Sequence, residues 1–307
     1  MNSQHPSLDH SDQLPYYLAF SMIPGIGMHT FSKLLAVFGT PENIYYQSST
    51  HLEALIGKKK AESISLFKKR NMPHRIFLAL NKKGVHIVPF SSLNRHKGAS
   101  SISPIPMCLF VRGSLSFLTK PSPTIAIVGT RKPTPYGIKC ARYFSQQLTQ
   151  AGFTVISGMA VGIDSYAHQT CIDSGGNTIA VLGTGVLAEQ TPQQVQQYAA
   201  IIESGGTILS EFPPYSDAKP GHFVIRNRLI AGLADATLVI EGTIRSGSCI
   251  TARNAAEQGK DVYCIPGQID SDNAQCTNML IKNGAHLVTS PEDITAHFSG
   301  QLGTMKL

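Results

Sequence analysis

Several features that would place the chain in a familiar class are missing from it. No apolar run is long enough to span a membrane, and residues 1–13 lack the basic start and apolar run of a secretory signal. The six cysteines form no CxxC pair and no Cys/His pair at metal-ligand spacing. We therefore expect a cytoplasmic protein without a bound metal, whose cysteines are reduced thiols in the core or in loops.

Charge is scarce, at 15% of the 307 residues, but it is unevenly placed. The net charge is +7, yet eleven basic residues face the single acid Glu62 between Lys58 and Lys97, and the rest of the chain is slightly acidic. These basic residues are Lys58, Lys59, Lys60, Lys68, Lys69, Arg70, Arg75, Lys82, Lys83, Arg95 and Lys97. Such a cluster favours a polyanionic partner, although a solvated surface explains the charge equally well.

The apolar pattern of residues 1–90 predicts a small helical domain. Apolar side chains recur every three or four residues between positions 14 and 22 and again between 31 and 38. Pro24–Gly27 separates these runs, and its proline and glycines suit a tight turn between two helices. A weaker copy of the pattern surrounds Leu55–Gly57. The arrangement resembles a helix-hairpin-helix or SAM-like domain, whose turn amides can face a DNA phosphate, but an ordinary helical hairpin remains an alternative.

Residues 91–122 predict a junction with short strands rather than a core element, because prolines interrupt them repeatedly. From residue 123 to 298, short β-branched apolar runs alternate with helical segments, which is typical of strands buried on both faces. The predicted strands are Thr124–Val128, Phe153–Ile156, Thr178–Leu182, Thr207–Leu209, Ala236–Ile240, Asp261–Ile265 and His286–Val288. We expect an α/β, extended Rossmann-like, doubly wound domain with a mostly parallel sheet, followed by a tail at 299–307.

Small and basic residues follow the predicted strands. Ligands of doubly wound domains lie outside the carboxyl ends of the strands, where small residues let a phosphate approach helix N-termini. The candidate binding residues are Gly129, Thr130, Arg131, Lys132, Gly158, Lys219, Phe223, Arg226, Asn227, Arg228, Ser246 and Gly247. Several basic loops along one edge, with Phe223 for base stacking, favour an extended strand over a free nucleotide. Because Arg226 and Arg228 are two residues apart, we expect at most one of them to face the same groove on a helix.

Two weaker patterns point toward catalysis. Gly183–Ala188 matches the dinucleotide fingerprint GxGxx[GA], but the loop continues to Pro192 before a helix can begin, and no acid ends a strand about twenty residues on. Asp164 and His168 have the spacing of an acid/base pair on one helical face. The helix N-terminus explains Asp164 more simply. We therefore expect neither a cofactor nor a catalytic residue.

The chain from about residue 106 to 298 carries a series of motifs in a fixed order. They are Ile127–Arg131, Tyr136–Gly137, Ser157–Asp164, Ala167–His168, Ala180–Gly183, Leu209–Glu211, Arg226–Leu233, Ser246–Ser248, Ile250–Ala252 and Pro266–Gly267. This series resembles the DNA processing protein A (DprA/Smf) family.

The resemblance implies a homodimeric Rossmann-type protein that binds single-stranded DNA regardless of sequence. It also implies that the protein loads RecA onto such strands in natural transformation, without known catalysis. Arg131 would be the main phosphate contact, and Gly129 and Thr130 would provide backbone at close approach. The opposite side of the pocket would be lined by Lys219, Phe223, Asn227 and Arg228, with amides from Ser246 and Gly247.

Four departures from the family pattern bear on the loop after Gly185 and its surroundings: Leu187, Thr191, Val224 and Cys276. We also expect no C-terminal winged-helix domain. One alternative is a nucleotide enzyme resembling the lysine-decarboxylase-like phosphoribohydrolases, although Arg245–Ser248 stands where their PGGxGT loop would lie. A second is a helix-hairpin-helix adaptor that holds duplex DNA.

Overall fold

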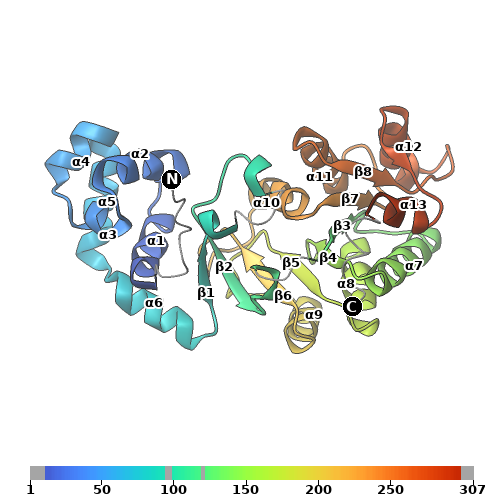
Figure 1. The fold of residues 1–307 in the computed structure, drawn as a ribbon, viewed down its shortest axis with the longest axis horizontal. Helices are drawn as coiled ribbons and strands as arrows, with labels where there is room; N and C mark the ends of the chain where they lie inside the picture. Colours follow the sequence, from blue (N-terminus) through green and yellow to red (C-terminus); the bar gives the residue numbers. More distant parts are fainter. Residues whose placement is uncertain (1–10, 94–98, 119–121, 299–307) are drawn as a thin grey trace, which may run out of the picture. The chain divides into compact units, whose positions relative to one another are not determined.

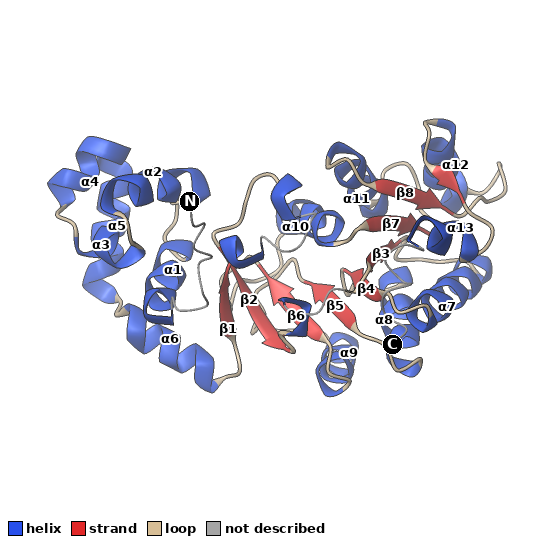
Figure 2. Ribbon diagram, in the orientation of Figure 1, coloured by secondary structure: helices blue, strands red, loops and turns tan. Residues whose placement is uncertain are grey.

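The structure is a computed structural model that describes residues 11–93, 99–118 and 122–298 (Figure 1). Arg95 and Lys97 of the basic cluster and the tail at 299–307 therefore lie outside the described residues. Nine strands form one sheet in the order β1-β2-β6-β5-β4-β3-β7-β8-β9, and helices alternate with strands along most of it (Figure 2). The predicted α/β class with a mostly parallel sheet is confirmed.

The chain divides into two compact units. The first contains residues 1–92 and 104–111, and the second contains residues 93–103 and 112–307. The segment expected to be a junction is therefore shared between the two units.

The first unit is built from six helices among the described residues. They are α1 (Leu14–Ser21), α2 (Met28–Phe38), α3 (Pro41–Tyr46), α4 (Ser49–Ile56), α5 (Lys58–Arg70) and α6 (Pro73–Lys82). The two expected turns join α1 to α2 and α4 to α5, and Gly57 takes a φ of +80° between the second pair. Its core includes Phe20, Phe31 and Ile64, all fully buried.

A strand pair joins the predicted helical region to the predicted junction, where short strands outside the core were expected. β1 (His86–Pro89) pairs antiparallel with β2 (Cys108–Gly113), so that His86 faces Val111 and Pro89 faces Cys108. The sequence analysis missed β1, because residues 1–90 were assigned to a helical domain and this short run was not interpreted as a strand. The burial of most of both strands shows that the pair belongs to the core.

The second unit contains the parallel sheet and the helices around it. Its strands are β3 (Thr124–Val128), β4 (Thr154–Ser157), β5 (Thr178–Val181), β6 (Thr207–Ser210), β7 (Ala236–Val239), β8 (Asp261–Cys264) and β9 (His286–Leu287). Its helices are α7 (Pro135–Gln150), α8 (Ile163–Asp173), α9 (Pro192–Glu203), α10 (Pro220–Leu233), α11 (Gly247–Glu257), α12 (Gln275–Lys282) and α13 (Glu292–Thr295). All seven predicted strands are present within one or two residues of their expected bounds.

The central strands are buried on both faces, as continuous apolar runs require. Phe144 of α7 and Ile163 of α8 pack with Ile125 and Ile127 of β3 in one core cluster. The sheet order reverses at β3, which has β4 on one side and β7 on the other. In doubly wound sheets such a reversal opens a crevice at the carboxyl ends of the strands.

His168 of α8 is completely buried in this unit. Its Nδ1 lies 2.7 Å from the Thr178 hydroxyl, and its Nε2 has no hydrogen-bond partner in the described part of the chain. Burial lowers the pKa of His168 to about 3, and the positive charge of Arg226 adds to this effect. The ring is therefore neutral in the folded protein at any ordinary pH, which agrees with packing rather than acid/base chemistry.

The depressed pKa of His168 predicts a specific acid sensitivity. The unfolded chain takes up a proton at this ring as the pH falls below 6.5, whereas the folded protein does so only near pH 3. Stability is therefore lost in this window as the pH falls, by about 1.4 kcal/mol per pH unit. The variant His168→Asn keeps a polar atom near Nδ1 but cannot titrate. Urea unfolding between pH 7 and 4.5 should show that wild type loses more stability than this variant, and parallel losses would contradict the assignment.

Candidate functional site

The loops after β3, β4 and β5 approach one another at the carboxyl edge of the sheet, and glycines let them do so. A Cβ atom at Gly158 would lie 2.7 Å from the Arg226 guanidinium, and one at Gly183 would lie 2.7 Å from the Phe223 ring. Both distances are too short for a real side chain. Gly158 and Gly183 are thus needed where α10 crosses the ends of β4 and β5.

The exposed part of this edge combines two cations with an aromatic face. Arg131 and Lys132 follow β3 and are exposed, whereas Phe223 on α10 is half-buried. The Arg131 guanidinium carbon lies 5.6 Å from the centre of the Phe223 ring. A guanidinium at this distance is attracted to the ring face, which holds Arg131 near the aromatic surface. The structure therefore brings together two of the predicted site residues that lie far apart in the sequence.

Arg226 of α10 is buried between the Phe223 ring and the ends of β4 and β5. Its side chain donates hydrogen bonds to the carbonyls of Gly158 (2.8 Å) and Val181, and its Nε donates to Asn227 Oδ1 (3.1 Å). Its guanidinium carbon lies 5.9 Å from the Phe223 ring centre. Burial lowers the pKa of Arg226 to about 10, partly offset by Asp164, so it remains charged at neutral pH. With only 4% of its surface exposed, Arg226 is a positioning residue for the Phe223 ring, and its direct contact with a ligand stays a prediction.

Asp164 is the anionic partner in the same buried region. It begins α8 and accepts hydrogen bonds from the backbone N–H groups of Gly158 (3.2 Å) and Ala160 (3.4 Å). Burial raises the pKa of Asp164, while the charge of Arg226 acts in the opposite direction. The carboxylate thus fixes the loop after β4, which agrees with the structural explanation favoured for it over acid/base catalysis.

Arg228 lies on another side of α10 from Arg226. Its Nη2 donates to Glu211 Oε2 at 2.5 Å, and burial raises the pKa of Glu211 against the influence of that cation. Arg228 is 6% exposed. This ion pair ties α10 to the segment after β6, and a direct ligand contact by Arg228 stays a prediction.

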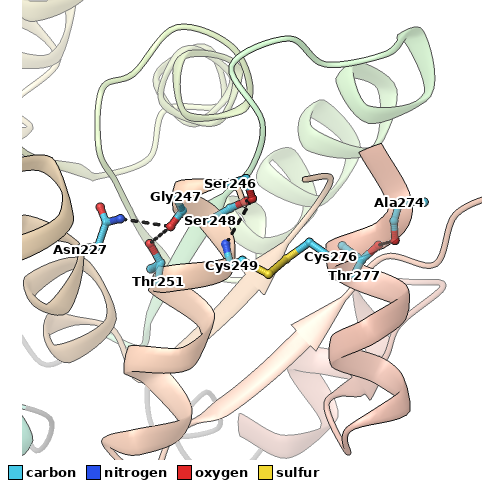
Figure 3. The surroundings of a disulfide bond; sticks show 9 residues. All are labelled: Asn227, Ser246, Gly247, Ser248, Cys249, Thr251, Ala274, Cys276 and Thr277. Carbon is cyan, nitrogen blue, oxygen red and sulfur yellow. Dashed lines mark hydrogen bonds between the residues drawn. A yellow bond between two sulfur atoms is a disulfide. The ribbon is translucent and has the colours of Figure 1, made fainter. Parts of the chain in front are cut away.

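The start of α11 lies beside α10, and Figure 3 shows the hydrogen bonds around it. Ser246 caps this helix and accepts a hydrogen bond from the Cys249 N–H (3.4 Å). Asn227 Nδ2 donates to the Gly247 carbonyl (3.1 Å), which joins α10 to this turn. Lys219 is exposed immediately before α10. Asn227 is therefore linked to Gly247, and contact of these residues with a ligand stays a prediction.

The sequence analysis gave no role to Glu241, which holds the Arg131 loop in place. Its carboxylate accepts hydrogen bonds from the Thr134 N–H (2.9 Å) and hydroxyl (2.5 Å), and its carbonyl accepts from the Thr130 N–H (2.8 Å). The acid is buried at the end of β7. The available sequence signal was an acidic residue directly after a predicted apolar strand. Its hydrogen-bond partner, Thr134, is far away in the sequence, in the segment that follows β3.

The prediction that all six cysteines are reduced thiols is wrong for two of them. Cys249 of α11 and Cys276 of α12 form a disulfide (Figure 3). They are 27 positions apart in the sequence, so no local spacing revealed the pair. The Cys276 N–H also donates to the Gly242 carbonyl (2.9 Å). The bond therefore fixes the start of α11, next to Ser246 and Gly247, to the start of α12.

The departures from the family pattern have plain local roles. Thr191 caps α9 and forms a reciprocal capping box with Gln194, so the glycine loop ends well before the helix begins. In a dinucleotide-binding fingerprint a helix begins directly after the glycines. The separation seen here agrees with the weak match of Gly183–Ala188 to that motif. Leu187 donates its N–H to the Pro214 carbonyl (2.6 Å), and Val224 is exposed on α10.

A comparison with known families matches residues 92–299 to the model described as DNA recombination-mediator protein A. The chain belongs to this family. The resemblance found in the sequence motifs is thereby confirmed.

Individual relatives agree with this assignment. Protein Smf of Synechocystis is 34% identical over 299 residues, which cover 92% of this chain and 71% of the relative. The X-ray structure of DNA processing protein A from Streptococcus pneumoniae superposes with a TM-score of 0.77 at 29% identity, covering 92% of this chain and 95% of that one. DNA processing protein A from Helicobacter pylori, described by its single-stranded DNA binding mode, gives 0.61 at 25% identity, covering 67% and 93%.

Two observations concern other classes of site. Across residues 11–93, 99–118 and 122–298, no three histidine, cysteine or acidic side chains gather as a metal site would need. No helix in this described part is long and apolar enough to cross a membrane.

The disulfide predicts a stability that depends on redox conditions. A crosslink closing a loop of this length contributes about 3.5 kcal/mol, so dithiothreitol should lower the free energy of unfolding of wild type by about that amount. The double variant Cys249→Ala/Cys276→Ala retains the four free cysteines, Cys108, Cys140, Cys171 and Cys264. Its guanidinium unfolding curve should not respond to the reductant. Equal sensitivity in both proteins would place the effect elsewhere.

Proposed function

We propose that this protein binds single-stranded DNA without sequence preference at the surface formed by Arg131, Lys132 and Phe223. The observation that carries the proposal is the exposed Arg131 guanidinium held against the half-buried Phe223 ring. Cations that follow a phosphate backbone, combined with an aromatic face for stacking, suit any base sequence. The described binding mode of the Helicobacter pylori relative supports the same ligand.

The amides at the start of α11 complete the proposed binding surface. Ser246 and Gly247 lie at the N-terminus of α11, where the helix dipole favours a phosphate. Lys219 adds a third exposed cation before α10. Several separate anchor points suit an extended strand, because a free nucleotide needs one compact cradle.

We propose further that the chain acts as a cytoplasmic homodimer without catalytic activity and loads RecA onto the bound strand in natural transformation. Membership of a recombination-mediator family supports this role. The arrangement of Glu241 argues against the phosphoribohydrolase alternative, which needs an available acid beside its glycine-rich loop. Both oxygens of this carboxylate are occupied by Thr134.

Removing the Arg131 guanidinium should weaken binding to all sequences alike. A phosphate contact carries no base information, so Arg131→Ala should lower affinity about tenfold and reduce the slope of log affinity against log salt by about one. Fluorescence anisotropy with mixed-sequence single strands and duplexes, across a salt series, measures both quantities. The control Arg253→Ala removes an exposed arginine from α11. Unchanged affinity in Arg131→Ala, or a preference for duplex, would overturn the proposed site.

Replacing the Phe223 ring should separate stacking from charge. The variant Phe223→Leu keeps an apolar side chain over Gly183 but removes the aromatic face. Stacking of one base contributes about 1–3 kcal/mol, so affinity should fall about tenfold with little change in the salt slope. The same anisotropy titrations test this expectation. A variant that binds as wild type would show that the ring only packs against its neighbours.

A further inference from the structure

A large groove of mixed polar and apolar lining begins at Arg131 and leaves the proposed binding surface along the helices. It has a volume of about 930 Å³. Its lining includes Arg131 after β3, Gly162 before α8 and Gln193 in the first turn of α9. It also includes Asp173 and Ala200, which lie near the ends of α8 and α9. α8 packs against both α7 and α9. The groove therefore has α8 as its floor and α7 and α9 as its walls, and it opens at the carboxyl edge of the sheet.

One face of each helix lines this groove. The lining positions are Ile138, Arg142 and Gln146 on α7, Ser165, Tyr166, Gln169, Thr170 and Asp173 on α8, and Gln193, Gln196, Gln197 and Ala200 on α9. On all three helices these positions fall one, three or four residues apart, which places them on one side of the helix. The lining holds the side-chain amides of five glutamines, beside apolar positions such as Ile138 and Val161.

The charged and aromatic groups of the groove favour a nucleic-acid strand. The Arg142 guanidinium carbon lies 5.2 Å from the centre of the Tyr166 ring, so the two planar groups are held together in the lining. Unpaired bases stack on tyrosine rings and on guanidinium planes. The lining contains the cations Arg131 and Arg142 against the single carboxylate of Asp173. Neutral amides can donate and accept hydrogen bonds at the edges of any base.

The walls of the groove are held in a fixed position. Gln197 Nε2 of α9 donates to the Ser165 carbonyl of α8 (3.0 Å), and the Ser165 hydroxyl donates to Gln197 Oε1 (3.0 Å) and the Ala160 carbonyl (2.9 Å). These bonds join α9 to the start of α8 and to the loop after β4. The groove is therefore preformed beside the Arg131 surface, which lowers the ordering cost of filling it.

We propose that this groove is a second single-strand subsite, which binds the nucleotides adjacent to the one whose phosphate contacts Arg131. This subsite extends the proposed function and rests on it. The face of α7 from Ile138 to Gln146 is about 12 Å long. At about 3.4 Å per stacked nucleotide, this length accommodates roughly three nucleotides. The strand would leave the sheet edge at Arg131 and run between α7 and α9 over Tyr166.

The length dependence of binding tests the subsite. In wild type, affinity for oligothymidylates should rise with length until both the edge and the groove are filled. The variant Arg142→Ala/Gln196→Glu changes two exposed side chains of the groove. Its affinity should stop rising about three nucleotides earlier, and it should bind a 20-nucleotide strand about tenfold more weakly than wild type.

A matched control separates the groove from general charge effects. The variant Arg253→Ala/Gln150→Glu makes the same charge change at exposed helical positions outside the groove lining. It should show the wild-type length dependence, and circular dichroism melting checks that both double variants fold. Identical length curves for the groove variant and wild type would overturn the subsite.

The single variant Arg131→Ala distinguishes the two proposals. If it weakens binding at every length while the groove variant behaves as wild type, the proposed function stands and the subsite fails. If Arg131→Ala binds normally at every length, the proposed surface fails, and the subsite that depends on it fails as well.

Discussion

The buried guanidinium of Arg226 is the interaction on which the site depends. It hydrogen-bonds the carbonyls of Gly158 and Val181, at the ends of the neighbouring strands β4 and β5, and it lies beneath Phe223. A buried cation is costly unless its donors are satisfied. Here strand-end carbonyls and Asn227 accept its hydrogen bonds. α10 is thereby fixed over the sheet edge, and the aromatic ring keeps one position.

The two sides of the binding surface are held by different means. On the side of β3, Glu241 holds the loop that carries Arg131 through Thr130 and Thr134. On the side of α11, the disulfide of Cys249 fixes the start of this helix to the start of the α12 segment. The sulfur atoms of both cysteines are almost inaccessible, and exchange requires that a thiolate reach a sulfur. Reducing agents should therefore act on this bond only when the segment opens.

Much of the second unit was predictable because its strands are buried on both faces. A strand such as Thr124–Val128 is buried along its whole length, so its residues must be almost all apolar. The sequence shows this pattern directly as a short apolar run. The antiparallel strand His86–Pro89 is as long as several predicted strands, but it was missed because it follows six helices and was assigned to the helical domain. The candidate loops were found because they follow the strands, and doubly wound sheets place their ligands there.

The sequence by itself determined the family, the order of the strands along the chain and the loops that carry the candidate binding residues. Only the tertiary structure decided what each residue does there. Arg131 and Arg226 both looked like phosphate ligands in the sequence, but one is exposed and the other is buried under Phe223. The difference depends on how α10 crosses the sheet, and so does the position of every ring and cation beside it. The position of α10 over the sheet is determined by contacts between segments that are far apart in the chain. Such contacts cannot be predicted from the local sequence.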